Sequence, residues 1–171
     1  MSNRKYCGNC GNLYQRQDWP RHCGECGEIA WKNPIPATFL LQPIYDPVTD
    51  GMGLAIARRA INPHAGEWAF MGGYVDMSDS DFISAAKREF QEESRLDPLG
   101  VGRIVHTEAN GNGIMMIAVL MSEAMNVNDF ITHGQTCPEN HELGVMWHYD
   151  EYKLCFSINR KVAQMWFDRE I

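Results

Sequence analysis

The sequence lacks an apolar run long enough to cross a membrane as a helix. Its longest purely apolar stretch, Ile114 to Met121, is far shorter than the roughly 20 residues that such a helix needs. The opening residues, Met-Ser-Asn-Arg-Lys-Tyr-Cys, also lack the apolar segment of a secretory signal. We therefore expect a cytoplasmic protein with no membrane partner.

Internal repeats and low-complexity segments are missing as well. Hydrophobic residues make up 44% and charged residues 22% of the chain, values that are ordinary for a globular protein. The composition therefore excludes a fibrous or intrinsically disordered chain. A length of 171 residues is enough for one compact domain with a small appendage, and a second full-sized domain would not fit.

Basic residues are scarce relative to acidic ones. The chain has 15 Lys and Arg against 22 Asp and Glu, which gives a formal net charge of -7. Non-specific binding to nucleic acid depends on Lys and Arg displacing counterions, so this balance works against a nucleic-acid partner. The acidic excess is better explained by sites for cations.

The six cysteines are unevenly distributed, because four of them fall within residues 7 to 26. These four form two C-x-x-C knuckles, Cys7 with Cys10 and Cys23 with Cys26, and four thiolates can enclose a zinc ion completely. A redox dithiol pair is disfavoured, since the strand-helix context of a redox motif is missing. We expect a structural zinc ribbon over residues 1–33 and a larger domain over residues 34–171.

The larger domain shows more strand patterns than helix patterns. Strands are predicted over residues 37–45, 53–59, 101–109, 114–122 and 144–148, and residues 110–113, Asn-Gly-Asn-Gly, are a strong hairpin signal. One helix is predicted to begin at a cap, Ser78 or Ser80, and to run to about Arg95. A last helix is predicted with Ser157 as its cap. This order indicates an α+β fold in which helices pack a mixed β-sheet.

The predicted first helix carries the motif R-E-x-x-E-E from Arg88 to Glu93. Residues three and four apart share a helix face, so Glu89, Glu92 and Glu93 project together. Three crowded carboxylates repel one another unless cations lie among them, and oxygen ligands suit Mg²⁺ or Mn²⁺. The alternative is a solvated, charge-rich helix face, which is common on exposed helices.

The segment from Gly72 to Leu96 resembles the Nudix box, which favours the metal site over that alternative. The matching residues, in order, are Gly73, Arg88, Glu89, Phe90, Glu92, Glu93 and Leu96. The chain departs from the box in three ways: it is one residue longer between Gly73 and Arg88, it has Asp79 or Ser80 at the first glutamate position, and it has Arg95 in place of the final glycine. The resemblance implies a Nudix fold, an α/β/α sandwich, and a pyrophosphatase activity.

The resemblance also implies roles for individual residues. Divalent cations would be held by Glu89, Glu92, Glu93 and the carbonyl of Gly73 or its neighbour Gly72, and catalysis would involve Arg88, Glu92, Glu93 and Glu142, with Glu139 close to Glu142 in sequence. The cations would neutralise the diphosphate and activate a water molecule. Arg59, Trp68 and Phe70 are predicted to contact the substrate.

The N-terminal ribbon and residues 32–36, 58–63 and 66–68 are similar to zinc-ribbon Nudix hydrolases that act on NADH, ADP-ribose or FAD. The segment S-Q-P-W-P-F-P of NADH pyrophosphatases is missing, which weakens that one specificity. The resemblance therefore implies a dinucleotide or another nucleoside diphosphate as the substrate. It leaves a homodimer open as the assembly.

Two other classes of function remain. A Nudix-fold sensor would bind such a nucleotide without cleaving it, and the intact glutamate trio argues against this. A nucleic-acid adaptor or an RNA-decapping protein would use the local positive charge of the ribbon, which comes from Arg4, Lys5, Arg16 and Arg21. The net charge argues against the adaptor.

Overall fold

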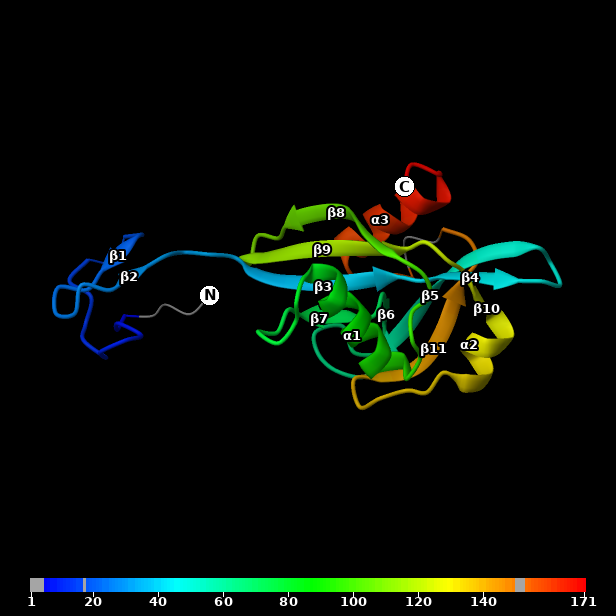
Figure 1. The fold of residues 1–171 in the computed structure, drawn as a ribbon, viewed down its shortest axis with the longest axis horizontal. Helices are drawn as coiled ribbons and strands as arrows, with labels where there is room; N and C mark the ends of the chain where they lie inside the picture. The colour runs from blue at the N-terminus through cyan, green and yellow to red at the C-terminus, as the bar shows by residue number, and fades with distance from the viewer. Residues whose placement is uncertain (1–4, 17, 150–152) are drawn as a thin grey trace.

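The computed structural model describes residues 5–16, 18–149 and 153–171. Figure 1 shows the N-terminal ribbon at one end of the molecule, joined to the larger domain by a single extended segment that leads into β3 (Ile35–Leu41). Arg4, one of the four cations noted in the ribbon, lies outside the described residues. In those described ranges, no helix has the length and apolar character needed to span a membrane.

The ribbon is held by two tight turns and one short hairpin. Each C-x-x-C knuckle closes with a backbone hydrogen bond, from the N–H of Gly11 to the carbonyl of Cys7 and from the N–H of Gly27 to the carbonyl of Cys23. Both glycines have positive φ, 77° and 75°, a conformation that other residues resist. Strands β1 (Arg21–His22) and β2 (Ile29–Ala30) flank the second knuckle in the sequence and pair antiparallel.

The first sheet of the larger domain has the order β7-β3-β9-β8. Its other strands are β7 (Gly72–Tyr74), β8 (Gly102–Ala109) and β9 (Ile114–Met121). β8 and β9 form the hairpin that the Asn-Gly-Asn-Gly segment predicts, whereas β3 pairs with β9 in parallel. β7 pairs antiparallel with β3 and was not predicted as a strand.

The second sheet has the order β10-β4-β5-β11, and β6 pairs with β5 beside this path. Its strands are β4 (Pro43–Asp46), β5 (Gly51–Arg59), β6 (Trp68–Ala69), β10 (Met125–Asn126) and β11 (Asn140–Met146). β11 begins four residues earlier than the strand predicted over residues 144–148. Because β10 is parallel to β4 and the other neighbours are antiparallel, this sheet is mixed, as expected.

The prediction of one strand over residues 37–45 is wrong, because the chain leaves the first sheet at Leu41 and enters the second at Pro43. Gln42, at the crossing, is completely buried. Its side-chain amide donates to the carbonyls of Pro43 and Glu123, and its side-chain oxygen accepts from the N–H of Leu99. These bonds satisfy a polar group that would otherwise be costly to bury.

The described residues contain three helices: α1 (Phe82–Ser94), α2 (Val127–His133) and α3 (Ser157–Phe167). The cap of α1 is Asp81 rather than Ser78 or Ser80, and its carboxylate and Ser84 form a reciprocal capping box. Ser157 is the first residue of α3 rather than its cap, which is Phe156. The short helix α2 was not predicted.

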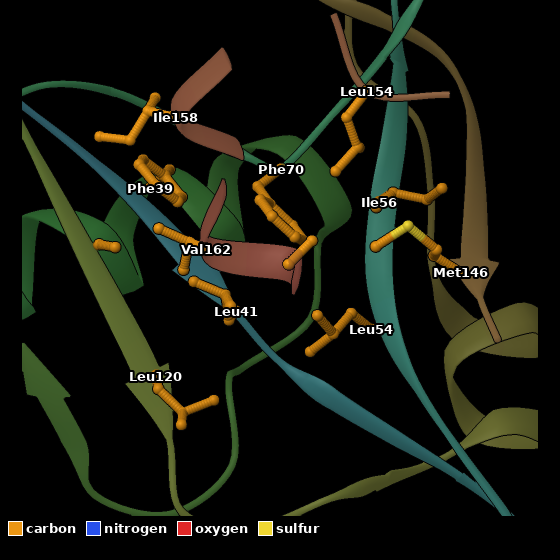
Figure 2. Close-up of a cluster of buried hydrophobic side chains, with 12 residues drawn as sticks. Phe39, Leu41, Leu54, Ile56, Phe70, Leu120, Met146, Leu154, Ile158 and Val162 are labelled. Carbon is orange, nitrogen blue, oxygen red and sulfur yellow. The ribbon is translucent and has the colours of Figure 1, made fainter. Parts of the chain in front are cut away.

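Both faces of the central strands β3, β5 and β9 are buried along most of their length. Along β3, Phe39 and Leu41 belong to one core cluster and Leu40 to the other, as the alternation of a strand requires. The first cluster joins the two sheets to α3 and is drawn in Figure 2. The second joins them to α1 and α2. Helices therefore cover opposite faces of the sheets, which is the α/β/α arrangement that was expected.

Candidate active site

Helix α1 lies against β3 and β7 because its inner face is made of small and apolar residues. Ala85 and Ala86 are fully buried and allow the helix to approach the sheet, and Phe90 fills the core beneath it. One turn of helix then brings Glu89 and Glu93 next to the same strand. The helix thus delivers two of the predicted metal ligands to one place.

Gly73 is in close contact with the first of these glutamates. A Cβ atom at Gly73 would lie 2.6 Å from Oε1 and 2.7 Å from Oε2 of Glu89. A Cβ atom here would displace the carboxylate of Glu89, so the position of that carboxylate against β7 depends on glycine at residue 73. The predicted proximity of Gly73 and Glu89 is therefore present in the structure.

Glu93 is fixed by two hydrogen-bonding partners from different strands. The N–H of Gly72 donates to its Oε1 at 2.8 Å, and the side-chain amide of Asn140 donates to its backbone carbonyl at 2.9 Å and reaches its Oε2 at 3.5 Å. Asn140, the first residue of β11, is itself buried. Glu93 therefore links α1 to both sheets.

Arg88 organises the other side of the acidic cluster. Its guanidinium forms a two-pronged ion pair with Asp79, with N–O distances of 2.9 Å, and donates to the carbonyl of Tyr74. The same group contacts Glu89 at 2.9 Å and Glu92 at 3.1 Å. Asp79 and Ser80 were the two candidates for the first glutamate position of the Nudix box. The structure shows that Asp79 is the one that pairs with Arg88. This ion pair lowers the pKa of Asp79 and raises that of Arg88.

The electrostatics of the site are unfavourable for bare carboxylates. Burial raises the pKa of Glu93 to about 7. The hydrogen bonds from Gly72 and Asn140 lower this pKa, but the negative charges of Glu89 and Glu139 raise it further. Burial also raises the pKa of Glu89, although Arg88 opposes it. Clustered, partly desolvated oxygen ligands next to a glycine backbone fit a divalent cation, which would relieve this repulsion.

This raised pKa predicts a pH-dependent stability for the magnesium-free protein. Below about pH 4.5, Glu93 is protonated in both the folded and the unfolded chain, and nothing is lost. As the pH rises to about 7, the unfolded chain gains the charged form and the folded chain resists it, so stability falls. Glu93→Gln removes this effect, and we expect it to stabilise the protein by about 2 kcal/mol at pH 8 but not at pH 4.5.

Urea denaturation of both proteins from pH 4.5 to pH 8 in magnesium-free buffer measures the difference. Groups that do not interact with Glu93 titrate equally in the two proteins and cancel, whereas the repulsion from Glu89 and Glu139 is part of the difference measured. An equal free-energy difference at both ends of the range would contradict a raised pKa at Glu93.

The remaining predicted acidic residues, Glu92 and Glu142, each form an ion pair with an arginine. Glu92 is exposed and contacts Arg88. Glu142, on β11, is exposed and pairs with Arg58 at 3.7 Å. The charge of Glu92 raises the pKa of Glu89, and the charge of Glu139, just before β11, raises the pKa of both Glu89 and Glu93.

The three predicted substrate contacts have different surroundings. Arg59 donates to the carbonyl of Pro63 at 2.9 Å and lies over the ring of Phe156. Trp68 is partly buried, and its ring covers Gly144 on β11. Phe70 is only 5% exposed and stacks on Phe39 in the core, so we leave it out of the proposed substrate site.

Asn140 is the site residue that sequence reasoning missed. It stands between Glu139 and His141, both exposed, and the local pattern is that of a polar loop. Only the pairing of β11 with β5 buries its side chain against α1. No signal within the sequence distinguishes it from the other asparagines of the chain.

The ribbon brings its four cysteines together. Cys7 and Cys26 have their sulfurs 3.7 Å apart, Cys10 and Cys23 have theirs 3.5 Å apart, and all four lie within 4.8 Å of one another. A tetrahedral zinc with Zn–S bonds of about 2.3 Å places its sulfurs about 3.8 Å apart. Backbone N–H groups lower the pKa of Cys7 to about 6 and that of Cys26 as well, whereas the neighbouring sulfurs, Cys26 first, raise the pKa of Cys10; a bound cation would offset that repulsion.

Comparison with solved structures shows the same fold. A Nudix hydrolase from Nitrosomonas europaea matches with a TM-score of 0.68 and 15% identity, over 96% of this chain and 91% of that one. The Nudix domain of NrtR from Shewanella oneidensis, solved with ADP-ribose, matches with a TM-score of 0.67 and 14% identity, over 83% and 92%. A C. elegans Ap4A hydrolase matches with a TM-score of 0.59 and 18% identity, over 80% and 97%.

Sequence comparison agrees over a shorter segment. The uncharacterized Nudix hydrolase NudL of Salmonella newport is 49% identical over 51 residues, which are 29% of this chain. The match spans only 27% of the length of that relative. The NUDIX domain profile matches residues 44–147, more than half of the chain. The chain therefore belongs to the Nudix family.

Proposed function

We propose that the protein is a divalent-metal-dependent hydrolase that cleaves the diphosphate bond of a nucleoside diphosphate linked to another moiety. The observation that carries this proposal is the convergence of Glu89 and Glu93 on the glycine pair Gly72-Gly73. A solvated, charge-rich helix face would not be packed against backbone in this way. The family of the chain supports the same activity.

Glu89, Glu92, Glu93 and the carbonyl of Gly73 are proposed to hold Mg²⁺ or Mn²⁺. When bound, the cations would neutralise the diphosphate oxygens and lower the pKa of the attacking water. Arg88 holds Glu89 and Glu92 in position through its ion pairs. Asn140 and the N–H of Gly72 hold Glu93, so that its carboxylate is oriented before substrate arrives.

A general base is still required to take a proton from the water. Glu92 and Glu142 are exposed to solvent, and each forms an ion pair with an arginine, Glu92 with Arg88 and Glu142 with Arg58. We assign this role to one of these two carboxylates, with Glu93 as the alternative if its charge is restored by the cations. Proton transfer to a positioned carboxylate contributes roughly 10²-fold to 10⁴-fold in rate.

The substrate class is inferred from the relatives and from residues on this chain. NrtR was solved with ADP-ribose, and the C. elegans relative is an Ap4A hydrolase. In this chain Arg59, at the end of β5, supplies a cation that can bind a phosphate group of the substrate. Trp68, on β6, supplies a flat aromatic surface that can stack on a base. We therefore propose ADP-ribose, FAD or an NADH-like dinucleotide as the substrate.

We further propose that residues 1–33 form a structural zinc ribbon and that residues 34–171 form the hydrolase domain. We also propose that the protein acts in the cytoplasm without a nucleic-acid or membrane partner. The closed four-sulfur geometry supports a structural role for the zinc. We propose a homodimer as the assembly. Light scattering of the purified chain measures its molar mass and tests this.

A substrate panel tests the proposed function. The protein is incubated with ADP-ribose, FAD, NADH, Ap4A and ATP in the presence of magnesium or manganese, and the products are separated by chromatography. We expect AMP from at least one of the first three, with kcat/KM at least about tenfold above that for ATP, a difference of 1.4 kcal/mol in the barrier.

The controls separate the alternatives. Omission of both metals should abolish turnover. Equal or faster cleavage of ATP would overturn the substrate class, and tight binding of ADP-ribose without any turnover would favour the sensor.

A further inference from the structure

We propose that His64, Glu67 and Cys155 form a second site for zinc or a similar transition-metal ion, separate from the ribbon and from the acidic cluster on α1. An imidazole nitrogen, a carboxylate oxygen and a thiol sulfur converge here, and all three ligand atoms lie within 4.8 Å of one another. The proposal does not depend on the proposed hydrolysis. It rests on the positions of these three side chains alone.

The spacing of the ligand atoms matches a metal site. Nδ1 of His64 and Oε1 of Glu67 form a hydrogen-bonded pair 3.3 Å apart, and a bound metal would replace that hydrogen bond. A tetrahedral zinc with Zn–N and Zn–O bonds near 2.1 Å separates such a pair by about 3.4 Å. The sulfur of Cys155 lies within 4.8 Å of both ligand atoms, so a movement of at most about 1 Å would give it a Zn–S distance of about 2.3 Å.

The two segments that carry the ligands are held together by the backbone. The N–H of Cys155 donates to the carbonyl of Trp68 at 2.8 Å, which fixes Cys155 beside β6. The N–H of Glu67 donates to the carbonyl of His64 at 3.1 Å, which closes the turn between the other two ligands. The edge of the His64 ring packs against Phe156, with ring centroids 5.3 Å apart. The donors are therefore positioned without the metal.

The mixture of donors selects the kind of ion. Magnesium prefers oxygen ligands in octahedral geometry, whereas nitrogen and sulfur donors suit zinc, cobalt or copper. His64 and Glu67 are exposed and Cys155 is half-buried, so the ion would have three protein ligands and one side open to water or an anion. This differs from the ribbon, in which four sulfurs close the site.

Cobalt binding to the full-length chain tests the proposal. Protein whose ribbon has been loaded with zinc is titrated with Co²⁺ in excess magnesium, and the absorption of cobalt-thiolate bonds is recorded. The wild-type chain is expected to take up one more equivalent of Co²⁺ than Cys155→Ser. His64→Ala and Glu67→Gln each remove one ligand and are expected to raise the Kd for Co²⁺ at least about tenfold. Mutation of residues that only hydrogen-bond to a metal ligand already weakens metal binding by about that factor.

Cys137→Ser is the matched control, because Cys137 is also a half-buried free cysteine. It should bind Co²⁺ as the wild type does. Equal cobalt uptake by the wild-type chain and Cys155→Ser would overturn the proposal, and so would an equal loss in Cys137→Ser. Hydrogen exchange gives a second measurement that does not use cobalt: zinc should slow exchange at residues 62–67 in the wild type but not in Cys155→Ser. Neither readout involves hydrolysis, so a chain that cleaves no dinucleotide can still pass or fail this test.

Discussion

Glu93→Gln is expected to reduce hydrolysis of the best dinucleotide substrate by at least ~10³-fold with the fold unchanged. Glutamine keeps the shape of the side chain and can keep the contact with the N–H of Gly72, which is 2.8 Å in the wild type. It removes the charge that would hold a cation. The cations stabilise charge that develops on the diphosphate, so loss of a ligand acts on the barrier rather than on the fold.

The measurement is kcat/KM at saturating magnesium, with circular dichroism as the check on folding. Glu108→Gln is the control, because Glu108 is a carboxylate on β8 that pairs with Lys161 away from α1. It should retain wild-type turnover. Near wild-type activity of Glu93→Gln would mean that Glu93 is not a ligand of the catalytic metal, and α1 would then be an ordinary charged helix.

The parts of the fold that could be predicted are those with local signals. The Asn-Gly-Asn-Gly hairpin and the helix that carries R-E-x-x-E-E are each specified by residues close together in the chain. β7 and the crossing between the two sheets at Gln42 have no such local signal, because each depends on contacts with segments distant in the sequence. Gln42 is satisfied by Leu99 and Glu123, more than 50 residues away, and its neighbours alone read as one continuous strand.

The same distinction applies to the candidate site. The glutamates of α1 and the glycine pair could be identified because their spacing along the chain is characteristic. The pairing of Asp79 with Arg88 could not be assigned from the sequence, since the insertion left two positions open and only the loop conformation selects one. Asn140 required the register of β11 against β5. Phe70 was predicted at the substrate, but stacking on Phe39 places it in the core.

Cys23→Ser is expected to abolish zinc binding by the ribbon and to unfold residues 5–30, while the larger domain stays folded. The ribbon of purified wild-type protein should contain about one zinc per chain, as one closed four-ligand site requires, in addition to any zinc bound at His64, Glu67 and Cys155. Apart from its turns, its hairpin and the stacking of Arg21 on Trp19 and Tyr14, the ribbon has only a small core cluster, which consists of Cys7, Tyr14 and Cys23 with Ala30 packed against them. Structural zinc supplies roughly 10–16 kcal/mol in small zinc-binding peptides, so its loss exceeds what three buried side chains can offset.

Two measurements distinguish loss of the metal from loss of the whole fold. Elemental analysis should show about one zinc per chain fewer in Cys23→Ser than in the wild type, with no change in Cys137→Ser, whose cysteine lies outside the ribbon. Hydrogen exchange should become fast in residues 5–30 and remain slow in β3, β5 and β9, since these strands belong to the separate core around α1 and α3. Retention of zinc and of slow exchange in the ribbon of Cys23→Ser would show that the ribbon does not depend on a four-cysteine site. Wild-type protein without zinc, with four reactive thiols, would lead to the same conclusion.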